Sequence, residues 1–349
     1  MKFSTVHLVG LFWAAPALTV APGCGHDVLM PGMPDAPGGA DISVVAPDGA
    51  APDLAPDLFV LEKWEPRNSG VTDDLWAVWG RGKEVFAAGA GGVILHSADG
   101  LKWMVERRGT SEILYGLGGF DQGEVFAVGS SGTILRRVAG AWSPAPSLVK
   151  RRLNAVWTGE VVAEVFAVGE GGTILRSADS GRSWLVETST TVNDLYCGVY
   201  RPSGDHFAAG KSGMMLTYPP KKLAWQAVPT STMHDIVAAA GVFDTVFVSF
   251  GGELLTRAGT VILNDGGNAL PDAPMGLFCA CLLFGECSAR LYLAGVSGGL
   301  STSRNCGRTW TLRIAPGADE LHRVWGPGEG SAYAVGRKGT ILYFHDPNP

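Results

Sequence analysis

The feature that most constrains the fold is a short apolar phrase that returns along the chain at intervals of about 40 residues. Each copy, such as VFAVG, has an aromatic residue at its second position; these residues are Phe86, Phe126, Phe166, Phe207, Phe247, Tyr292 and Tyr333. A phrase of the LWAVWG type precedes most copies, and a phrase of the GTIL type follows them. Most units then contain a tryptophan further along; these are Trp103, Trp142, Trp184, Trp225 and Trp310. Each unit therefore predicts four short strands separated by glycine-rich turns.

A unit of this length and strand content is typical of one blade of a β-propeller. A helical solenoid would need apolar residues spaced by about 3.6 positions, a period that the units lack. The last unit stops after its third strand, at Tyr343-Phe344, and the missing strand precedes the first unit as LFVLEKWEP. We therefore predict an all-β, seven-bladed β-propeller whose N-terminal strand closes the last blade.

The N-terminus predicts export. Lys2 precedes an apolar segment, Val6 to Ala21, that is too short and too interrupted by proline for a stable membrane span. The phrase Ala21-Pro22-Gly23-Cys24 then resembles a bacterial lipobox, in which the cysteine is acylated. We predict a lipoprotein-type signal peptide over residues 1–23 and lipidation of Cys24. An ordinary signal peptide, with Cys24 incidental, is the alternative.

Residues 24–57 are rich in Pro, Ala, Gly and Asp and contain the triplet APD repeatedly, with no periodic apolar face. Such a segment buries too little surface to fold, so it predicts a disordered tether. The propeller is then expected over residues 58–346. This organisation predicts an exported lipoprotein at the bacterial outer membrane or cell surface, held to the membrane through its lipid anchor only.

Two segments share a further motif. Residues 177–184 read SADSGRSW, residues 303–310 read SRNCGRTW, and residues 97–103 are a shorter version. On these phrases the chain resembles the BNR/Asp-box propellers, most of all the photosystem II assembly-factor type and more distantly the sialidases. The resemblance extends over roughly residues 60–346. It implies structural roles, in turns between the third and fourth strands of a blade, for Asp99, Asp179, Trp184, Asn305 and Trp310.

No catalytic motif accompanies the repeats. The Arg-Ile-Pro phrase of sialidases is absent, no Tyr–Glu nucleophile pair is assignable, and HExxH, GxSxG and P-loop phrases are missing. The histidines are scattered along the chain. We therefore predict a non-enzymatic protein with no cofactor and no metal, and a sialidase-like glycoside hydrolase is the remote alternative.

The cysteines gather in the sixth unit. No CxxC pair suggests zinc, and an exported protein meets an oxidising compartment, so disulfides are favoured. We expect one disulfide within the set Cys281, Cys287 and Cys306, and a free thiol at Cys197, which we place on a buried inner strand.

The formal net charge of −6 equals the charge of the six aspartates in residues 25–61, so the rest of the chain is close to neutral. A near-neutral body excludes nucleic acid as the default partner, because phosphate binding needs a basic surface. In a blade, the turns between the second and third strands and the links between blades share one face. We predict a bipolar docking face there, with solvated loop charges as the alternative. Asp194, Asp235, Asp272, Asp319 and Glu320 occupy one arc of this face, and the candidate binding residues form its basic arc: Arg107, Arg108, Lys150, Arg151, Arg152, Arg337 and Lys338.

Together these patterns predict an extracytoplasmic protein-binding or assembly platform. The alternative is a carbohydrate-binding or cell-surface recognition module. Trp79, Trp157 and Trp325 recur at one position of the first strand, where they either stack on sugar rings or pack in the core. The sequence does not identify the partner.

Overall fold

The computed structural model describes residues 63–345 except 109, 122, 160–162, 202–203, 221, 223, 241–245, 250–253, 256–260, 263–273, 281–289, 296–297, 305–308, 316–319 and 329. The chain divides into two units, Met1–Asp57 and Leu58–Pro349, and every described residue belongs to the second. The predicted signal peptide and tether, including Cys24, lie outside the described residues.

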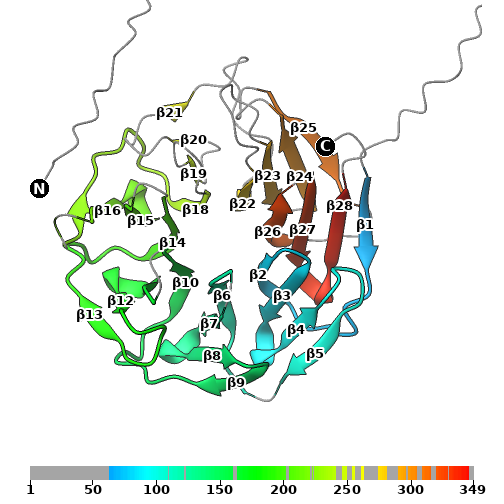
Figure 1. The fold of residues 1–349 in the computed structure, drawn as a ribbon. Coiled ribbons are helices and arrows are strands. Elements are labelled where there is room, and N and C mark those ends of the chain that lie inside the picture. Colours follow the sequence, from blue (N-terminus) through cyan, green and yellow to red (C-terminus); the bar gives the residue numbers. More distant parts are fainter. Residues whose placement is uncertain are drawn as a thin grey trace, which may run out of the picture. The chain divides into compact units, whose positions relative to one another are not determined.

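Within the described ranges the strands form seven four-stranded antiparallel sheets (Figure 1). Four sheets follow one another in the first two-thirds of the chain. They consist of β2 (Leu75–Arg81), β3 (Glu84–Gly89), β4 (Ile94–Ser97) and β5 (Met104–Arg107); β6 (Leu114–Gly119), β7 (Val125–Gly129), β8 (Ile134–Val138) and β9 (Ala141–Pro144); β10 (Leu153–Thr158), β11 (Val165–Gly169), β12 (Ile174–Ser177) and β13 (Leu185–Glu187); and β14 (Leu195–Tyr200), β15 (His206–Gly210), β16 (Met215–Tyr218) and β17 (Gln226–Ala227).

The remaining sheets consist of β18 (Ile236–Ala240), β19 (Val246–Ser249), β20 (Leu254–Leu255) and β21 (Val261–Ile262); β22 (Pro274–Ala280), β23 (Arg290–Gly295), β24 (Gly299–Ser303) and β25 (Thr311–Ile314); and β26 (Leu321–Gly328), β27 (Ser331–Gly336), β28 (Ile341–His345) and β1 (Lys63–Arg67). Short 3-10 turns lie between the second and third strands of several sheets; these are η1 (Ala90–Gly92), η2 (Ser130–Gly132), η3 (Glu170–Gly172), η4 (Lys211–Gly213) and η5 (Arg337–Gly339).

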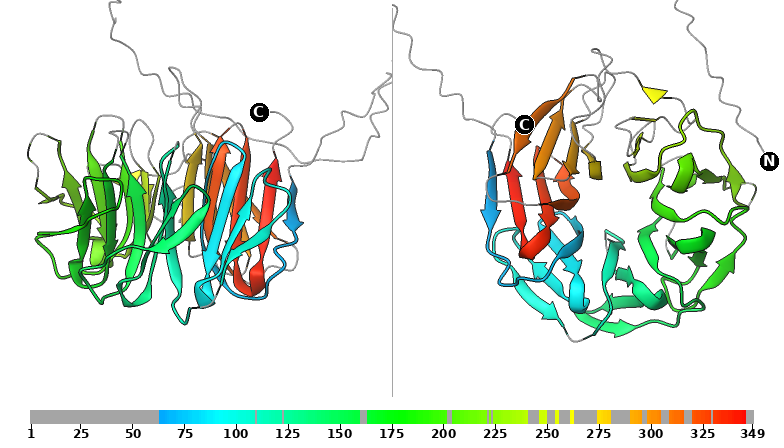
Figure 2. Two further views of the ribbon diagram at one scale, coloured as in Figure 1. Left: turned by 60° about the horizontal axis from the view of Figure 1, so that its bottom comes forward. Right: turned by 180° about the vertical axis from the view of Figure 1, so that it is seen from behind.

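The sheets surround a central axis. The first strand of each sheet contacts the first strand of the next, from β2 through β6, β10, β14, β18 and β22 to β26, and β26 contacts β2. Figure 1 shows these strands innermost, with β5, β9, β13, β25 and β1 on the outside. Seen from the side, the connections between strands gather at two opposite faces (Figure 2). This arrangement is a β-propeller.

The recurring aromatic phrase forms the second strand of a sheet. Every residue of β7 and β11 is buried, because both faces of each sheet are covered by neighbouring sheets. Phe86, Phe126 and Phe166 are fully buried between sheets. The core is therefore a series of sheet-to-sheet interfaces around the ring.

The sheet that contains β26 takes strands from both ends of the described chain. β1 pairs antiparallel with β28 from Lys63–His345 to Arg67–Ile341. Trp64 of β1 is 4% exposed and packs against Phe344, with a distance of 5.2 Å between ring centroids. The N-terminal strand thus covers the outer edge of β28.

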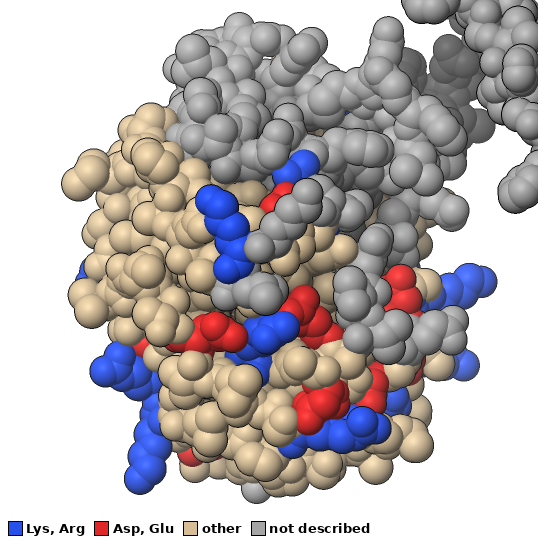
Figure 3. Space-filling model, turned by 60° about the vertical axis from the view of Figure 1, so that its left-hand side comes forward, with Lys and Arg blue, Asp and Glu red and all other residues tan. Residues whose placement is uncertain are grey.

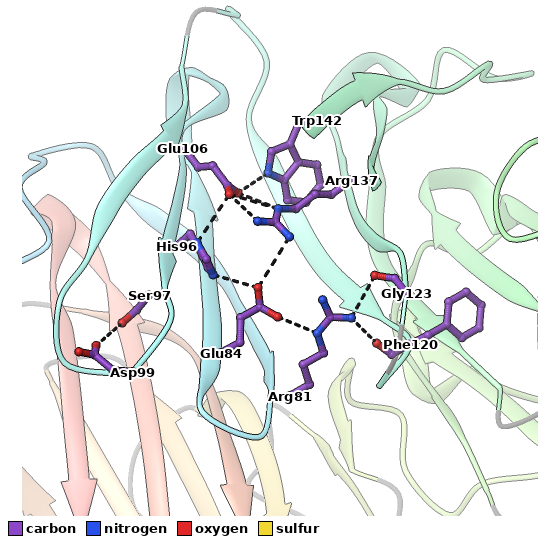
Figure 4. Close-up of polar contacts among 10 residues, drawn as sticks. All are labelled: Arg81, Glu84, His96, Ser97, Asp99, Glu106, Phe120, Gly123, Arg137 and Trp142. Carbon is purple, nitrogen blue, oxygen red and sulfur yellow. Dashed lines mark hydrogen bonds and ion pairs between the residues drawn. The ribbon is translucent and has the colours of Figure 1, made fainter. Parts of the chain in front are cut away.

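Polar clusters lie between sheets on the side away from the channel. Between the β2–β5 and β6–β9 sheets, Arg137 Nη2 donates to Glu106 Oε1 over 2.7 Å and Trp142 Nε1 donates to Glu106 Oε2 over 2.7 Å (Figure 4). His96 lies between two carboxylates, with Nε2 3.0 Å from Glu84 Oε1 and Nδ1 3.6 Å from Glu106 Oε1. The contacts of Arg137 and Trp142 with Glu106 join adjacent sheets through partly buried polar groups, and those of His96 link strands of one sheet.

A second cluster joins the β10–β13 and β14–β17 sheets. Trp157 Nε1 donates to His206 Nδ1 over 3.1 Å, so the ring proton of His206 is on Nε2, which lies 3.2 Å from Glu164 Oε2. Arg176 Nε donates to the other oxygen of Glu164 over 2.7 Å. Hydrogen bonds from His206 and Arg176 outweigh burial and lower the pKa of Glu164.

Candidate functional site at the mouth of the central channel

The links between sheets are held rigidly at one face of the ring. The residue before an inner strand accepts a hydrogen bond from the 3-10 turn of the preceding sheet: Gly171 N donates to Asp194 Oδ1 over 2.7 Å and Ser212 N donates to Asp235 Oδ1 over 2.8 Å. Asp74 Oδ1 accepts in the same way from Lys338 N, over 2.9 Å. These bonds fix the loops that surround the channel opening on this face.

The second residue of several inner strands projects into this opening, which we call the channel mouth. Trp76 and His322 stack in parallel with 3.8 Å between ring centroids, and Tyr115 meets Trp76 edge-on at 5.7 Å. His322 Nδ1 lies 2.8 Å from the Leu75 carbonyl oxygen of the next sheet, and Asn154 Nδ2 donates to the equivalent Leu195 oxygen over 2.7 Å. The mouth is thus an aromatic pocket whose polar members hold neighbouring sheets together.

Charges of both signs border the pocket, which has a volume of about 220 Å³. The Arg152 guanidinium lies 5.2 Å from the centre of the Tyr115 ring, and its Nη2 is 3.3 Å from Glu170 Oε1. Burial, together with the Asp235 and Asp194 carboxylates, raises the pKa of Tyr196. The pocket therefore offers stacking surfaces, hydroxyl groups and paired charges to a ligand.

Below the mouth, a cavity of about 170 Å³ is lined mainly by small apolar side chains and backbone. Arg323 reaches this cavity from β26, and burial lowers its pKa. Cys197 also faces it and is a free thiol, as expected, whose pKa is raised to about 12 by burial. A thiol in that state is neutral and has no nucleophilic character near neutral pH.

The recurring tryptophans lie further along the inner strands and pack between sheets. Trp157 is 8% exposed and stacks on Phe166 with 5.7 Å between centroids. Its indole also lies against Gly198 of the next sheet, where a Cβ atom would overlap the ring. Trp325 and Trp79 lie against Gly80 and Gly119 in the same manner. Core packing, and not sugar stacking, is the role their positions support.

The predicted basic residues lie on or beside the connections at the face of the channel mouth. Three of them form ion pairs: Arg108 with Asp73, Arg152 with Glu170, and Arg337 with Glu320. Arg151 donates to the Gly171 carbonyl oxygen over 3.1 Å, and Lys150 is exposed. Arg107 is half-buried at the end of β5, and Lys338 is exposed on η5. On the side that Figure 3 brings forward, Lys and Arg side chains likewise lie beside Asp and Glu.

The turn aspartates of the SADSGRSW type accept hydrogen bonds locally. Ser183 donates to Asp179 from both its backbone nitrogen (2.8 Å) and its hydroxyl (2.6 Å), and these bonds lower the pKa of Asp179 to about 2. Asp99 accepts from the backbone of Leu101 and Lys102. Trp184 is buried against Phe126. Trp310 is half-buried, and Asn305 lies outside the described residues.

The predicted disulfide cysteines, Cys281, Cys287 and Cys306, also lie outside the described residues. Among the residues that are described, no group of three or more His, Cys, Asp or Glu side chains is placed to hold a metal ion. In the same part of the chain, no helix has both the length and the apolar character that crossing a membrane requires.

Sequence reasoning missed the channel mouth. Its residues share one position, directly after the leading apolar residue of each inner strand, but differ in type: Trp76, Tyr115, Asn154, Tyr196 and His322. The alignment of the repeats contains the signal, because this is the strand position at which residue type varies most among the units. Arg323, one position further on, was also missed, although it is the exception at a position that holds a small residue in the inner strands β2, β6, β10, β14 and β18.

The chain matches no protein-family profile, and no curated protein is recognisably similar to it in sequence. Solved structures are similar in fold. YCF48 bound to D1 peptide has a TM-score of 0.63 at 17% identity, covering 81% of this chain and 95% of that chain. YCF48 from Cyanidioschyzon merolae has a TM-score of 0.64 at 17% identity, covering 82% and 99%. The WD40 β-propeller domain of Doa1 has a TM-score of 0.63 at 11% identity, covering 81% and 97%. These similarities confirm the β-propeller fold.

Proposed function

We propose that this protein is a non-enzymatic propeller that binds a protein partner at the face of the channel mouth and acts as an assembly platform outside the cytoplasm. The observation that carries this proposal is the convergence of rigid loops on a pocket of aromatic and charged side chains. Loops held in this way lose little conformational entropy when a ligand binds, which favours recognition of an extended segment.

The similarity in fold to YCF48 supports a peptide or protein as the ligand, because one solved form of YCF48 contains a bound D1 peptide. The charges at the face support the same conclusion. Lys150 and Arg151 form no ion pair within the described part of the chain, and they stand beside the mouth residue Arg152. An acidic segment of the partner would meet this basic arc, and association would slow as salt rises.

We further propose that the ring is a seven-bladed propeller closed by its N-terminal strand, and that a lipid on Cys24 tethers it. The pairing of β1 with β28 supports the closure, because it covers the outer edge of β28. Replacing Cys24 by Ala is expected to move the protein from the detergent phase to the aqueous phase, and a mature N-terminus without acyl groups in intact-mass analysis would refute the anchor.

The binding proposal is tested by quantitative pull-down from native membranes. The paired change Lys150→Glu and Arg151→Glu reverses the unpaired basic charge beside the mouth, so we expect it to reduce capture of the partner roughly ten-fold or more. Lys222→Glu is the matched control. Lys222 is an exposed lysine on the connection between β16 and β17, which emerges at the opposite face.

If both variants capture the same proteins at the same level while remaining folded, the partner does not bind at the basic arc. If the wild-type protein captures nothing specifically, the platform function itself is wrong. Binding to a glycan array in place of protein capture would favour the carbohydrate-recognition alternative.

A further inference from the structure

Two adjacent links at the face of the channel mouth differ from the other described links in one respect. Two residues before the aspartate that accepts the turn hydrogen bond, the links into β14 and β18 carry Val192 and Met233. The same position holds Thr72, Ser111 and Lys150 in the links into β2, β6 and β10. In these three equivalent links the position is polar, so the apolar residues in the links into β14 and β18 stand out against the other copies of the repeat.

Val192 and Met233 are 86% and 83% exposed, the highest exposures among the large apolar side chains described. Both links are held in place by side-chain to backbone bonds: Asn193 N donates to Thr191 Oγ1 over 3.0 Å, and His234 N donates to Thr232 Oγ1 over 3.1 Å. An apolar side chain held in water on a rigid loop costs little further entropy when a partner covers it. The two residues are therefore preformed anchors.

The surroundings of these anchors are acidic. Asp194 follows Val192 by two positions, Asp235 follows Met233 by two positions, and neither carboxylate forms an ion pair with a Lys or Arg among the described residues. Together with burial, both carboxylates raise the pKa of the Tyr196 hydroxyl at the channel mouth. We call these four residues, Val192, Asp194, Met233 and Asp235, the Val192–Met233 sector. It combines exposed apolar side chains with carboxylates at the channel mouth, and it lies beside the link into β10, which carries basic residues.

We propose that the Val192–Met233 sector is the specificity subsite of the binding face and takes an extended segment of the partner in which an apolar residue neighbours a Lys or Arg. This inference rests on the proposed function and names the partner's chemistry. The apolar residue covers Val192 and Met233, and the cation neutralises Asp194 and Asp235. A segment that continues toward Lys150 and Arg151 would then be acidic at that end.

The test uses the full chain and a synthetic array of Gly/Ser peptides. Each peptide carries one Leu or Phe and, at a varied spacing, one Lys, Arg, Asp or Ser. The wild-type protein should bind the peptides with Lys or Arg best. The paired change Val192→Thr and Met233→Thr, which installs the residue found at Thr72, should weaken this binding roughly ten-fold or more. Asp235→Asn keeps the acceptor for Ser212 N and should remove the preference for Lys or Arg over Ser.

Leu185→Thr is the control, because Leu185 is an exposed apolar residue on the outer strand β13 and should leave binding unchanged. Equal binding of all peptide classes by the wild-type protein, or full binding by the paired threonine variant, would overturn the inference. The partner pull-down separates the two proposals: if the paired threonine variant captures the partner like the wild type, this subsite is wrong and the platform function stands. If the wild type captures no partner, the platform function fails.

Discussion

The two ends of the same inner strands have different surroundings. At the mouth, Trp76 stacks on His322 and remains partly open to the channel opening. Three residues later, Trp79 lies against Gly119 of the next sheet, as Trp157 lies against Gly198. One strand thus places one tryptophan at the channel mouth and another into the core.

The comparison shows that residue type alone does not separate a binding residue from a packing residue in this repeat. What separates them is the neighbouring strand. A glycine opposite the tryptophan leaves room for the indole between sheets, whereas at the mouth Trp76 stacks on His322 of the neighbouring sheet and lines the pocket. Changes at the packed end should therefore reduce stability, and changes at the mouth should reduce binding.

The largest effect is expected for Trp157→Ala. This change removes a buried indole and the donor to His206, so the free energy of unfolding should fall by about 3–5 kcal/mol. Gly198→Ala alone should also destabilise, because the new Cβ overlaps the indole. In the Trp157→Ala background that second penalty should shrink, which a double-mutant cycle by chemical denaturation measures. Additive effects would mean that the two residues are not packed together.

A second prediction distinguishes the mouth end of the inner strands from their packed end by how the free energy of unfolding depends on pH. Burial lowers the pKa of His322 at the mouth, so below pH 6.5 the unfolded chain binds a proton that the folded chain resists, and stability falls. Glu164 is linked to Trp157 through His206, and hydrogen bonds lower its pKa. Its contribution to the free energy of unfolding is therefore present above pH 4.5 and is lost as pH falls below that value. The free energy of unfolding, measured from pH 7.5 to 3.5, should therefore decline in two stages.

His322→Asn should remove the first stage, and Glu164→Gln should remove part of the second. If His322→Asn leaves the decline between pH 6.5 and 5 unchanged, a titratable group other than His322 is responsible. The comparison of the two ends would then lose this support.

The smallest effect on stability is expected for Trp76→Ala. Trp76 is half-buried and its stacking partner His322 stays bonded to Leu75, so the loss should be about 1 kcal/mol. Capture of the partner should nevertheless fall. A loss of stability as large as that of Trp157→Ala, measured by the same denaturation, would show that the mouth is part of the core. The distinction between a packed end and a mouth end of the inner strands would then be wrong.

The sequence predicted the strands well because each apolar phrase is local. The phrases from Val85, Val125 and Val165 form β strands, and the turns after them fall at glycines, as expected. The Glu84–His96–Glu106 cluster was not predicted, because it depends on the register of three neighbouring strands within one sheet. Its signal was nevertheless present, since a Glu stands two positions before Phe86, Phe126 and Phe166 alike.

The candidate site was predicted only in part. The face was chosen from the order of strands within a repeat, which follows from antiparallel pairing alone. The ion pairs that neutralise Arg108 and Arg337 were not foreseen, because they depend on how the connections at one end of a sheet approach each other: Glu320, before β26, lies next to Arg337, after β27. The stacking of Trp76 on His322 joins residues about 250 positions apart, and no local pattern indicates it.

The central claim, that a protein partner binds at the face of the channel mouth, is tested most directly by site-specific photo-crosslinking in native membranes. A photoreactive residue would replace Lys150 or Met233 on that face, and Leu101 or Lys222 on connections at the opposite face. We expect a discrete protein adduct from Lys150 and Met233 and none from Leu101 and Lys222. Adducts from Leu101 and Lys222 alone, or equally from all four positions, would contradict the claim.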